Sequence, residues 1–153
     1  MTPGELLQKV KDRLVQQLGI AAEHVLIGAD PLAVELPRSG QTFLLVCPAG
    51  TRFEGEQHPQ FVLEDWHFSV TIYQRSQLDR LEEAEKAFLR PGGLYEVKGQ
   101  VLRALVGWLP GEGCAGVVQA QSTEGPEVVQ HIQRQCHFWR LTITFSAPFA
   151  WTL

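Results

Sequence analysis

The sequence has few cysteines, no long apolar run and no excess of basic charge, and each absence excludes a class of protein. Cys47, Cys114 and Cys136 are odd in number and show no CxxC spacing, so we expect no disulfide framework and a reducing cytoplasm. Apolar runs of only a few residues are too short to cross a membrane. The net charge of −4 is mildly acidic, whereas general binding of nucleic acid needs a basic surface.

Motifs of common cofactor and metal sites are also missing. The glycine-rich residues 110–113 follow neither the GxGxxG nor the Walker pattern and indicate turns. His131, Cys136 and His137 match no zinc spacing. The first residues mix charges of both signs and lack the apolar stretch of a signal peptide, so we expect none. We therefore expect no cofactor and no bound metal.

One pattern invites an interpretation as a catalytic triad. Asp65, His67 and Ser69 fall on one face of a predicted strand. Side chains at positions i and i+2 of a strand stand about 7 Å apart, whereas a triad needs hydrogen-bond contact. A solvated strand face is the better interpretation, and we expect no enzyme activity.

What is present is a pattern of strands and helices in a chain sized for one domain. With 153 residues, of which 44% are apolar and 20% charged, residues 1–153 fit a single globular domain. Two segments alternate apolar and polar residues with the period of a half-buried strand. Their apolar members are Trp66, Phe68, Val70, Ile72, Trp139, Leu141, Ile143 and Phe145. The chain thus predicts strand, helix and strand around one shared apolar layer.

Helices are predicted by capping residues and by helical spacing of apolar residues. Thr2-Pro3-Gly4-Glu5 can form a capping box before an amphipathic helix that Gly19 ends. A second helical run spans residues 78–88, and Pro91-Gly92-Gly93 must interrupt it. A third continues from Leu94 to Trp108.

The connections are less clearly patterned. Residues 24–28 suit a short strand or an extended connection, and residues 37–40 suit a hairpin turn between residues 32–36 and 43–47. Residues 48–59 are polar and rich in Gly and Pro, which predicts a loop or mobile arm. Residues 117–121 are a candidate strand, while residues 122–133 fit no single pattern.

Aromatic residues are more numerous than such a small sheet with two helices needs to bury. Four tryptophans and eight phenylalanines leave two interpretations open: exposed anchors for a partner, or a second layer of helices over the other sheet face. The strands around residues 43–47 and 138–146 also carry few charges, so we expect a partner chain to cover one of their edges. The candidate interface residues are Phe138, Arg140, Phe149, Trp151, Arg52 and Phe53.

Three segments carry a resemblance to a known family. They are Trp66-His67-Phe68-Ser69-Val70-Thr71-Ile72-Tyr73, the helix from Gly93-Leu94-Tyr95-Glu96 to Leu102-Arg103-Ala104-Leu105-Val106-Gly107-Trp108, and Phe138-Trp139-Arg140-Leu141-Thr142-Ile143-Thr144-Phe145. Their order resembles the tail terminator and tail completion proteins of tailed bacteriophages, especially the family encoded just before the sheath gene in Mu-like phages and tail-derived bacteriocins. The resemblance spans residues 6–145. Residues 78–89 and 48–59 depart from the family's simplest form.

The resemblance implies an α+β fold, with a mostly antiparallel sheet of about four to five strands and two to three helices packed on it. Such proteins form a hexameric ring that caps the tail tube, ends its polymerisation and gives the head a joining surface. The implied partners are further copies of the chain, the tail tube, the sheath protein and a head-completion protein. The implied location is the bacterial cytoplasm during assembly, and then the tail of a virion or tail-like particle.

Two other functions remain alternatives at this point. One is a small hydrolase-like enzyme that uses His67 with a carboxylate from elsewhere in the fold. The other is a module that binds a small ligand or peptide in a pocket between helix and sheet.

Overall fold

The computed structural model describes residues 1–29, 41–53, 55, 60–75, 88–131 and 136–153. Its elements follow the chain as α1 (Pro3–Leu18), a 3₁₀ turn (Ala22–His24), β1 (Val25–Ile27), β2 (Thr42–Phe53), β3 (Phe61–Arg75), α3 (Leu94–Leu105), β4 (Gln119–His131) and β5 (Cys136–Thr152). The strands form one sheet in the order β1-β2-β3-β5-β4, in which β1 pairs parallel with β2 and the other pairs are antiparallel. The predicted α+β fold is confirmed.

Helix α1 begins and ends where its capping residues predict. The Thr2 hydroxyl accepts a hydrogen bond from the Glu5 backbone N–H, and the Glu5 carboxylate accepts one from the Thr2 backbone N–H. These two bonds satisfy donors that the first turn of a helix leaves without intrahelical partners. Gly19 ends the helix in the left-handed region, with φ of 65°.

Helix α3 ends earlier than its apolar spacing predicts. The expected run reached Trp108, but the helix stops at Leu105 because Gly107 takes a positive φ of 81° and the chain turns there. Trp108 instead packs beside α1, where the Arg13 guanidinium lies 5.5 Å from its ring centroid. The Arg13 side chain also donates to the Ala104 carbonyl at 3.0 Å, which ties the two helices together.

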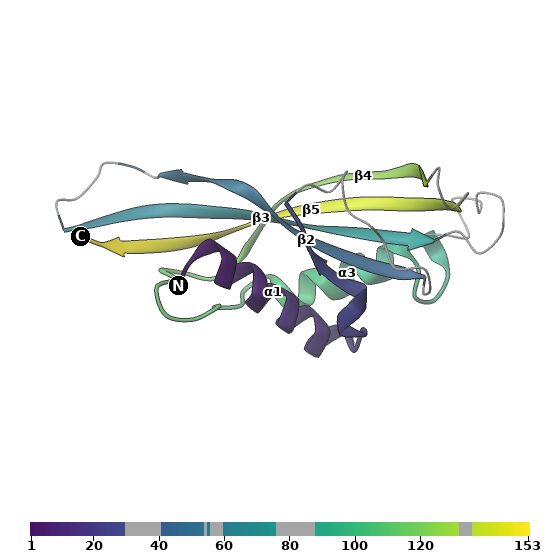
Figure 1. The fold of residues 1–153 in the computed structure, drawn as a ribbon, viewed down its shortest axis with the longest axis horizontal. Helices are drawn as coiled ribbons and strands as arrows, with labels where there is room; N and C mark the ends of the chain where they lie inside the picture. Colours follow the sequence, from purple (N-terminus) through teal and green to yellow (C-terminus); the bar gives the residue numbers. More distant parts are fainter. Residues whose placement is uncertain (30–40, 54, 56–59, 76–87, 132–135) are drawn as a thin grey trace.

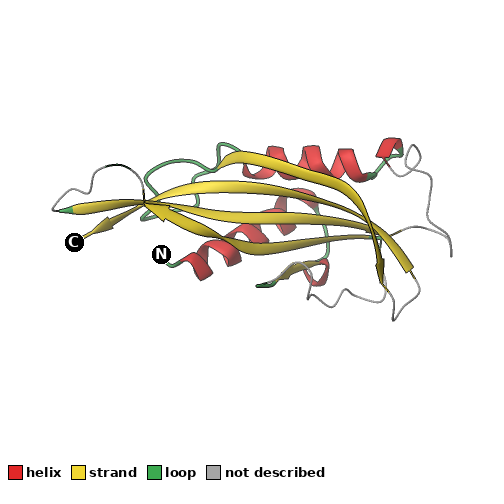
Figure 2. Ribbon diagram, turned by 90° about the horizontal axis from the view of Figure 1, so that it is seen from above, coloured by secondary structure: helices red, strands yellow, loops and turns green. Residues whose placement is uncertain are grey.

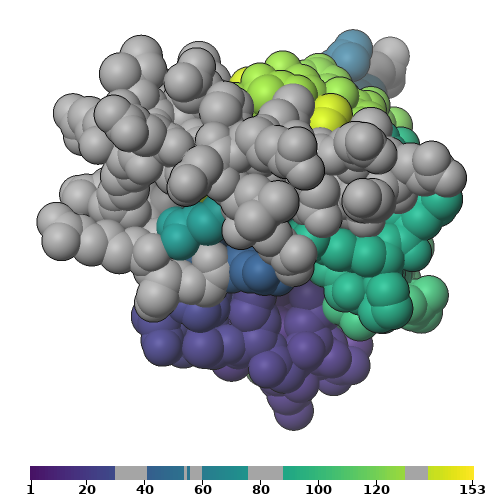
Figure 3. Space-filling view, turned by 90° about the vertical axis from the view of Figure 1, so that its right-hand side faces the viewer, coloured from purple at the N-terminus to yellow at the C-terminus, as the bar shows by residue number. Residues whose placement is uncertain are grey.

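Both helices cover the same face of the sheet (Figure 1). From the end that the right of Figure 1 shows, α1 and the segment containing α3 pack side by side below the strands (Figure 3). The main core lies between the sheet and the two helices. It is formed by the apolar side chains that alternate along the strands and by the inner faces of the helices. It includes Leu6, Val10, Leu14, Leu44, Val46, Trp66, Phe68, Val70, Ile72, Leu94, Val101, Leu141, Ile143 and Phe145. Trp66 and Phe68 are buried, as their positions predicted.

The opposite sheet face holds a second, smaller apolar cluster. Phe43, Leu45, Cys47, Tyr73 and Phe138 are all buried there. Their side chains alternate with those of the main core along the same strands, because successive residues of a strand point to opposite faces. Burial on both faces explains why residues 43–47 of β2 are apolar without alternation.

Two stretches that lack a regular alternation of apolar and polar residues are strands. Residues 48–53 were predicted as part of a loop, but they continue β2 after a bulge between Pro48 and Thr51. Residues 122–131 belong to β4, which includes bulges at two places along its pairing with β5. A bulge shifts the register by a residue, so the simple period-two signal is lost although pairing continues. The predicted strand at residues 117–121 begins at Gln119.

Other predictions fall outside the described residues or are wrong. The turn at residues 37–40 and most of the helix predicted over residues 78–88 lie outside the described part of the chain. Residues 24–28 contain the short strand β1. Residues 138–146 offer no open edge for the partner chain that we expect to cover one of the weakly charged strands, because β5 pairs there with β3 on one side and with β4 on the other. Sequence pattern does not reveal strand order, since an interior strand and a covered edge strand can have the same alternation.

The buried aromatic face of β3 gives a first prediction. Phe68 is buried and stacked on Phe145 with ring centroids 5.3 Å apart, whereas its neighbour His67 is half-buried on the other face. Phe68→Ala or Trp66→Ala should lower the free energy of unfolding by about 3–5 kcal/mol, because each leaves a cavity in the core. His67→Ala should shift the melting temperature by only a degree or two. Chemical denaturation would measure this, and a large loss for His67→Ala would contradict it.

A close approach at Gly113 gives a second prediction. Gly113 has φ of 91°, and a Cβ there would overlap the Phe149 ring. Gly50, with φ of 89°, has open space around the same position, so it is a matched control. Both alanine variants carry the left-handed strain of about 1–2 kcal/mol. Gly113→Ala should lose about 1–3 kcal/mol more than Gly50→Ala in urea unfolding, because its methyl group must displace a packed ring. Equal losses would show that the ring yields without cost.

Candidate functional site

One end of the sheet extends past both helices (Figures 1 and 2). It consists of residues 48–53 of β2, residues 61–66 of β3 and residues 147–152 of β5, and we call it the arm. Within it β3 and β5 pair without a register shift, with Phe61 opposite Thr152, and β2 pairs with β3 again after its bulge, with Phe53 opposite Glu64. The C-terminus lies at its tip (Figure 1). The arm is therefore a direct continuation of the central strands, held by the same backbone ladder.

The loop after α3 braces the base of the arm. The Ala115 backbone N–H donates to the Pro148 carbonyl at 2.9 Å, and the Ala150 N–H donates to the Gly113 carbonyl at 3.1 Å. Below these bonds, Trp66 and Phe149 stack with ring centroids 4.0 Å apart and planes 12° apart. This bracing fixes the direction of the arm relative to the helical layer.

Large apolar side chains remain exposed on both faces of the arm. Phe53 is 57% exposed and Trp151 is 38% exposed on the side of the sheet that faces the helices farther along. Phe61 and Leu63 are exposed on the opposite side, and Leu153 is exposed at the tip. We call these five residues the arm patch. Clustered exposed apolar side chains are typical of a surface that meets a partner.

An apolar pocket of about 400 Å³ opens in the arm. Its walls are Phe53, Val62, Trp151, Thr152 and Leu153, and its charged member is Glu64. Glu64 is only 8% exposed. Its Oε1 accepts hydrogen bonds from the indole N–H groups of Trp66 and, at 3.4 Å, of Trp151.

A second cluster of exposed apolar side chains lies at the other end of the sheet. Leu89 is 75% exposed, and Tyr95 and Val128 are also exposed. They are grouped around Phe88 and Trp139, whose ring centroids lie 5.0 Å apart, and Phe88 also contacts the Tyr95 ring. Val128 pairs directly with Trp139 in the β4–β5 register. We call these five residues the far-end patch.

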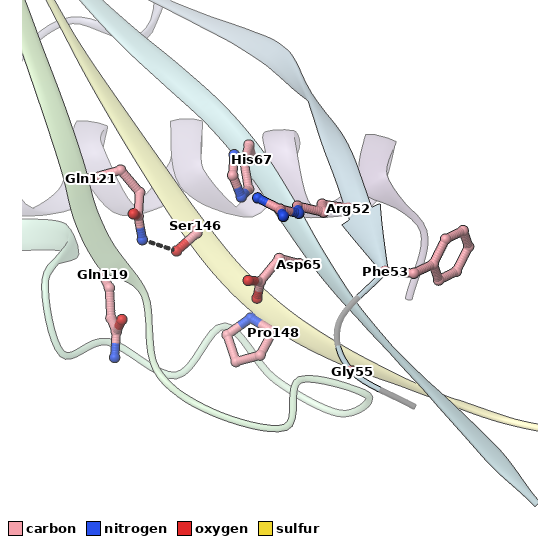
Figure 4. A pocket seen from close by; sticks show the side chains of 9 residues that line it. All are labelled: Arg52, Phe53, Gly55, Asp65, His67, Gln119, Gln121, Ser146 and Pro148. Atoms are coloured by element: carbon pink, nitrogen blue, oxygen red, sulfur yellow. Dashed lines mark hydrogen bonds between the residues drawn. The ribbon is translucent and has the colours of Figure 1, made fainter. Parts of the chain in front are cut away.

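A polar pocket of about 710 Å³ lies on the sheet face opposite the helices, at the base of the arm (Figure 4). Its lining residues come from four segments, and they are Arg52, Phe53, Gly55, Asp65, His67, Gln119, Gln121, Ser146 and Pro148. The Gln121 amide donates to the Ser146 hydroxyl at 2.6 Å. The pocket offers both donors and acceptors, with an arginine and an aspartate on adjacent strands.

The polar pocket is lined by two members of the triad pattern, Asp65 and His67, but not by the third, Ser69. The hydroxyl beside His67 belongs instead to Ser146, its register partner on β5. Sequence spacing could not have found Ser146, because it lies far away along the chain. Among the described residues, Ser146 is hydrogen-bonded to Gln121 and shares no hydrogen bond with His67. Within the described part of the chain, no hydrogen bond links Ser146 to a base of the kind that activates a nucleophilic hydroxyl.

The six candidate interface residues divide into three groups, which are exposed, buried and half-buried. Arg52, Phe53 and Trp151 are exposed on the arm, where Phe53 and Trp151 line the apolar pocket and Arg52 lines the polar pocket on the other sheet face. Phe138 and Phe149 are buried, so the expectation that they are exposed is wrong. Phe138 packs in the second cluster, with T-shaped contacts to Phe43 and Tyr73. Phe149 stacks on Trp66.

Arg140, the sixth candidate, is half-buried within a polar group on the second sheet face. Its side chain pairs with the Glu127 carboxylate at 2.8 Å and bonds to the Tyr73 hydroxyl. Burial by itself would lower the pKa of Arg140, but the hydrogen bonds to Glu127 and Tyr73 outweigh it and raise this pKa. Burial raises the pKa of the Tyr73 phenol above its usual value, although Arg140 opposes this shift. Arg140 thus has internal partners that explain its position.

No group of three or more potential metal ligands occurs among the described residues. The side chains of His131, Cys136 and His137 lie outside the part of the chain whose side chains are described. Neither described α-helix combines the length and the apolar content needed to cross a lipid bilayer.

Comparison of the sequence with protein-family models and with curated proteins gives no match.

The buried phenol of Tyr73 gives a third prediction. Its raised pKa means that the folded state holds the proton more tightly than the unfolded chain, whose tyrosines ionise near pH 10. The corresponding stability is complete below pH 10 and is lost as the pH rises above it. The free energy of unfolding should therefore fall between pH 9 and 11 more steeply for the wild type than for Tyr73→Phe. Urea titrations at each pH would measure this, and parallel curves would contradict it.

Proposed function

We propose that this protein is a structural subunit that assembles head to tail into a closed ring. The arm patch and the far-end patch are its two contact surfaces. The observation that carries the proposal is the arm itself, which projects beyond the helical layer and keeps large apolar side chains exposed on both faces. Removing apolar surface from water contributes about 25 cal/mol per Å². Burying the exposed side chains of the arm against another copy therefore stabilises the assembly.

The positions of the two patches support a head-to-tail arrangement. The patches lie beside opposite ends of β3. Glu64 lies in the arm, and Gln74, near the other end of β3, pairs with Trp139 of the far-end patch. At about 3.3 Å per residue, these points are roughly 33 Å apart. Two different patches at opposite ends cannot both meet their own copies in one symmetric dimer. Unlike patches can meet reciprocally in an antiparallel two-fold dimer, or head to tail in a ring when the rotation closes and in a filament when it does not. Of these arrangements, the ring is the one that we propose.

The sheet edges support contact through the patches rather than through open-ended strand pairing. The outer strand β4 carries Glu124 and Glu127 and includes Pro126, which has no backbone N–H to donate. On the other side, β1 pairs only with residues 44–46 of β2, and beyond it β2 has a bulge and Arg52. Charges, prolines and bulges are the usual devices that prevent edge-to-edge aggregation.

In its finer form, the proposal rests on the resemblance of the sequence to phage tail terminator proteins. The ring would then be hexameric, would cap the tail tube and would provide the surface that joins the head. Its partners would be the tube protein, the sheath protein and a head-completion protein. It would assemble in the bacterial cytoplasm and remain in the tail of the virion or tail-like particle.

A mixing experiment with two blocked variants tests the ring. Phe53→Ser removes an anchor of the arm patch, and Leu89→Ser removes one of the far-end patch. The wild type should give species above 17.1 kDa in native mass spectrometry and light scattering across a concentration series, with the hexamer favoured at high concentration. Each variant alone should shift toward monomer. Their equimolar mixture should form heterodimers and nothing larger, because each pair retains only one intact contact.

The control and the contradicting results are direct. Leu109 is 55% exposed outside both patches, so Leu109→Ser should assemble like the wild type. A wild-type chain that stays strictly monomeric at millimolar concentration, and does not bind tail tubes from the same genome, would rule out the ring. Full assembly by either blocked variant would show that its patch is not a contact surface.

A further inference from the structure

Glu64 is a buried carboxylate in an apolar part of the arm. Its side chain is enclosed by Trp66, Trp151 and the other walls of the apolar pocket. Both indole donors bond to the same oxygen, Oε1, so neither of them donates to Oε2. Among the described residues, no cation forms an ion pair with Glu64. Charged groups that are buried are normally paired, because removing a charge from water is costly.

The walls of the pocket suit a cation. Trp151 and Phe53 are aromatic and line it together with the carboxylate. The face of an aromatic ring attracts a cation within about 6 Å, and the attraction is strongest for tryptophan. Aromatic walls with one buried carboxylate therefore favour an ammonium or guanidinium group over a neutral or anionic ligand.

The far-end patch holds a cation of this kind at its rim. The Lys98 ammonium lies 5.8 Å from the centroid of the Tyr95 ring. Two described cations at this end of the sheet already have partners, since Arg90 donates to Gln74 and Arg140 pairs with Glu127. Among the described residues, the partner of the Lys98 ammonium is the Tyr95 ring. Lys98 also has a long flexible side chain that can extend from the rim of the patch into a facing pocket.

We propose that the apolar pocket of the arm binds the Lys98 ammonium of the neighbouring copy, with Glu64 as its counter-charge. This inference rests on the proposed ring and names the contact that gives the ring its direction. The ammonium lies against Trp151 and Phe53 and donates to Glu64 Oε2, while Oε1 keeps its two indole donors. The arm patch and far-end patch supply apolar burial around this ion pair, which fixes the register of the two copies.

A simpler role for Glu64 is to accept the two indole hydrogen bonds within a single chain. Glu64→Gln separates the two roles, because the amide oxygen still accepts from Trp66 and Trp151 while the negative charge is gone. If Glu64 serves only its own chain, this variant should assemble like the wild type. If Glu64 binds a cation, the variant should fold normally but associate weakly.

The heterodimer formed by the two blocked variants isolates one arm contact for measurement. The intact arm belongs to the Leu89→Ser copy, and the intact far-end patch belongs to the Phe53→Ser copy. Glu64→Gln is added to the first and Lys98→Gln to the second, separately and together. Each change alone should weaken the heterodimer at least tenfold, since losing one member of a desolvated charge pair leaves the other unpaired. Together they should weaken it by little more than either alone, which shows direct coupling.

Controls and overturning results follow from the same measurement. Glu23→Gln, an exposed change near the 3₁₀ turn, should leave the heterodimer affinity unchanged. The melting temperature of Glu64→Gln should stay within a few degrees of its parent. Heterodimers with unchanged affinity in Glu64→Gln, or with fully additive losses, overturn the cation contact and leave the ring standing. If no heterodimer forms at all, both the ring and the proposal that the pocket binds a second copy of the chain are overturned.

Titration with a small organic cation tests the pocket independently of association between copies. Tetramethylammonium chloride, compared with sodium chloride at equal ionic strength, should shift the NMR signals of the Trp66 and Trp151 indole N–H groups. The shift should saturate in the Leu89→Ser protein and disappear in its Glu64→Gln derivative. Shifts that are equal for the two salts would show that the pocket does not select an organic cation, and would overturn the proposal.

Discussion

The pairing of β3 with β5 is the interaction on which the rest of the structure depends. The two strands pair without a register shift from Phe61 opposite Thr152 to Arg75 opposite Phe138. This register places Phe68 against Phe145 on the sheet face that the helices cover, and Tyr73 against Arg140 on the other face. A slip of one residue would turn every buried side chain of β3 toward the wrong face, so the two packed faces hold the register in place.

The same pairing produces the arm. Because β3 and β5 both continue beyond the helices, residues 61–66 of β3 pair with residues 147–152 of β5 on one side and with the end of β2 on the other, but they lack a helical cover (Figure 1). The Trp66–Phe149 stack, the hydrogen bond that the Gly113 carbonyl accepts and the one that the Ala115 N–H donates hold the base of this extension. The arm is therefore positioned rigidly where it begins and keeps apolar side chains exposed where it ends. That combination suits a surface that meets another molecule in a defined orientation.

The two pockets differ in the chemistry that they allow. The polar pocket collects Arg52, Asp65 and His67, but the hydroxyl that it contains is held by Gln121. The apolar pocket is smaller and holds one buried carboxylate among aromatic rings. In the first pocket polar groups already lie among polar neighbours. In the second, a charge is buried without a described counter-charge, and this imbalance points to a partner more directly.

The sequence by itself determined the main elements and the inner face of the sheet. The caps of α1, the alternation of residues 66–73 and the helical spacing after Leu94 are local signals, because each depends on neighbours a few residues away. They sufficed for the α+β fold and for the burial of Trp66 and Phe68. Bulges at Pro48 and within β4 hid two strand segments, since a shift in register destroys the alternation on which recognition depends.

Only the tertiary structure decided strand order, the exposure of the aromatic residues and the pockets. Phe149 and Trp151 look alike in sequence, yet one is buried under Trp66 and the other is exposed. Ser146 and His67 meet only because β5 lies beside β3. Glu64 likewise becomes a buried carboxylate only when the strands bring Trp66 and Trp151 around it. These contacts join residues that are distant along the chain. A local sequence pattern depends only on neighbouring residues, so it does not show which distant segment packs against a given strand.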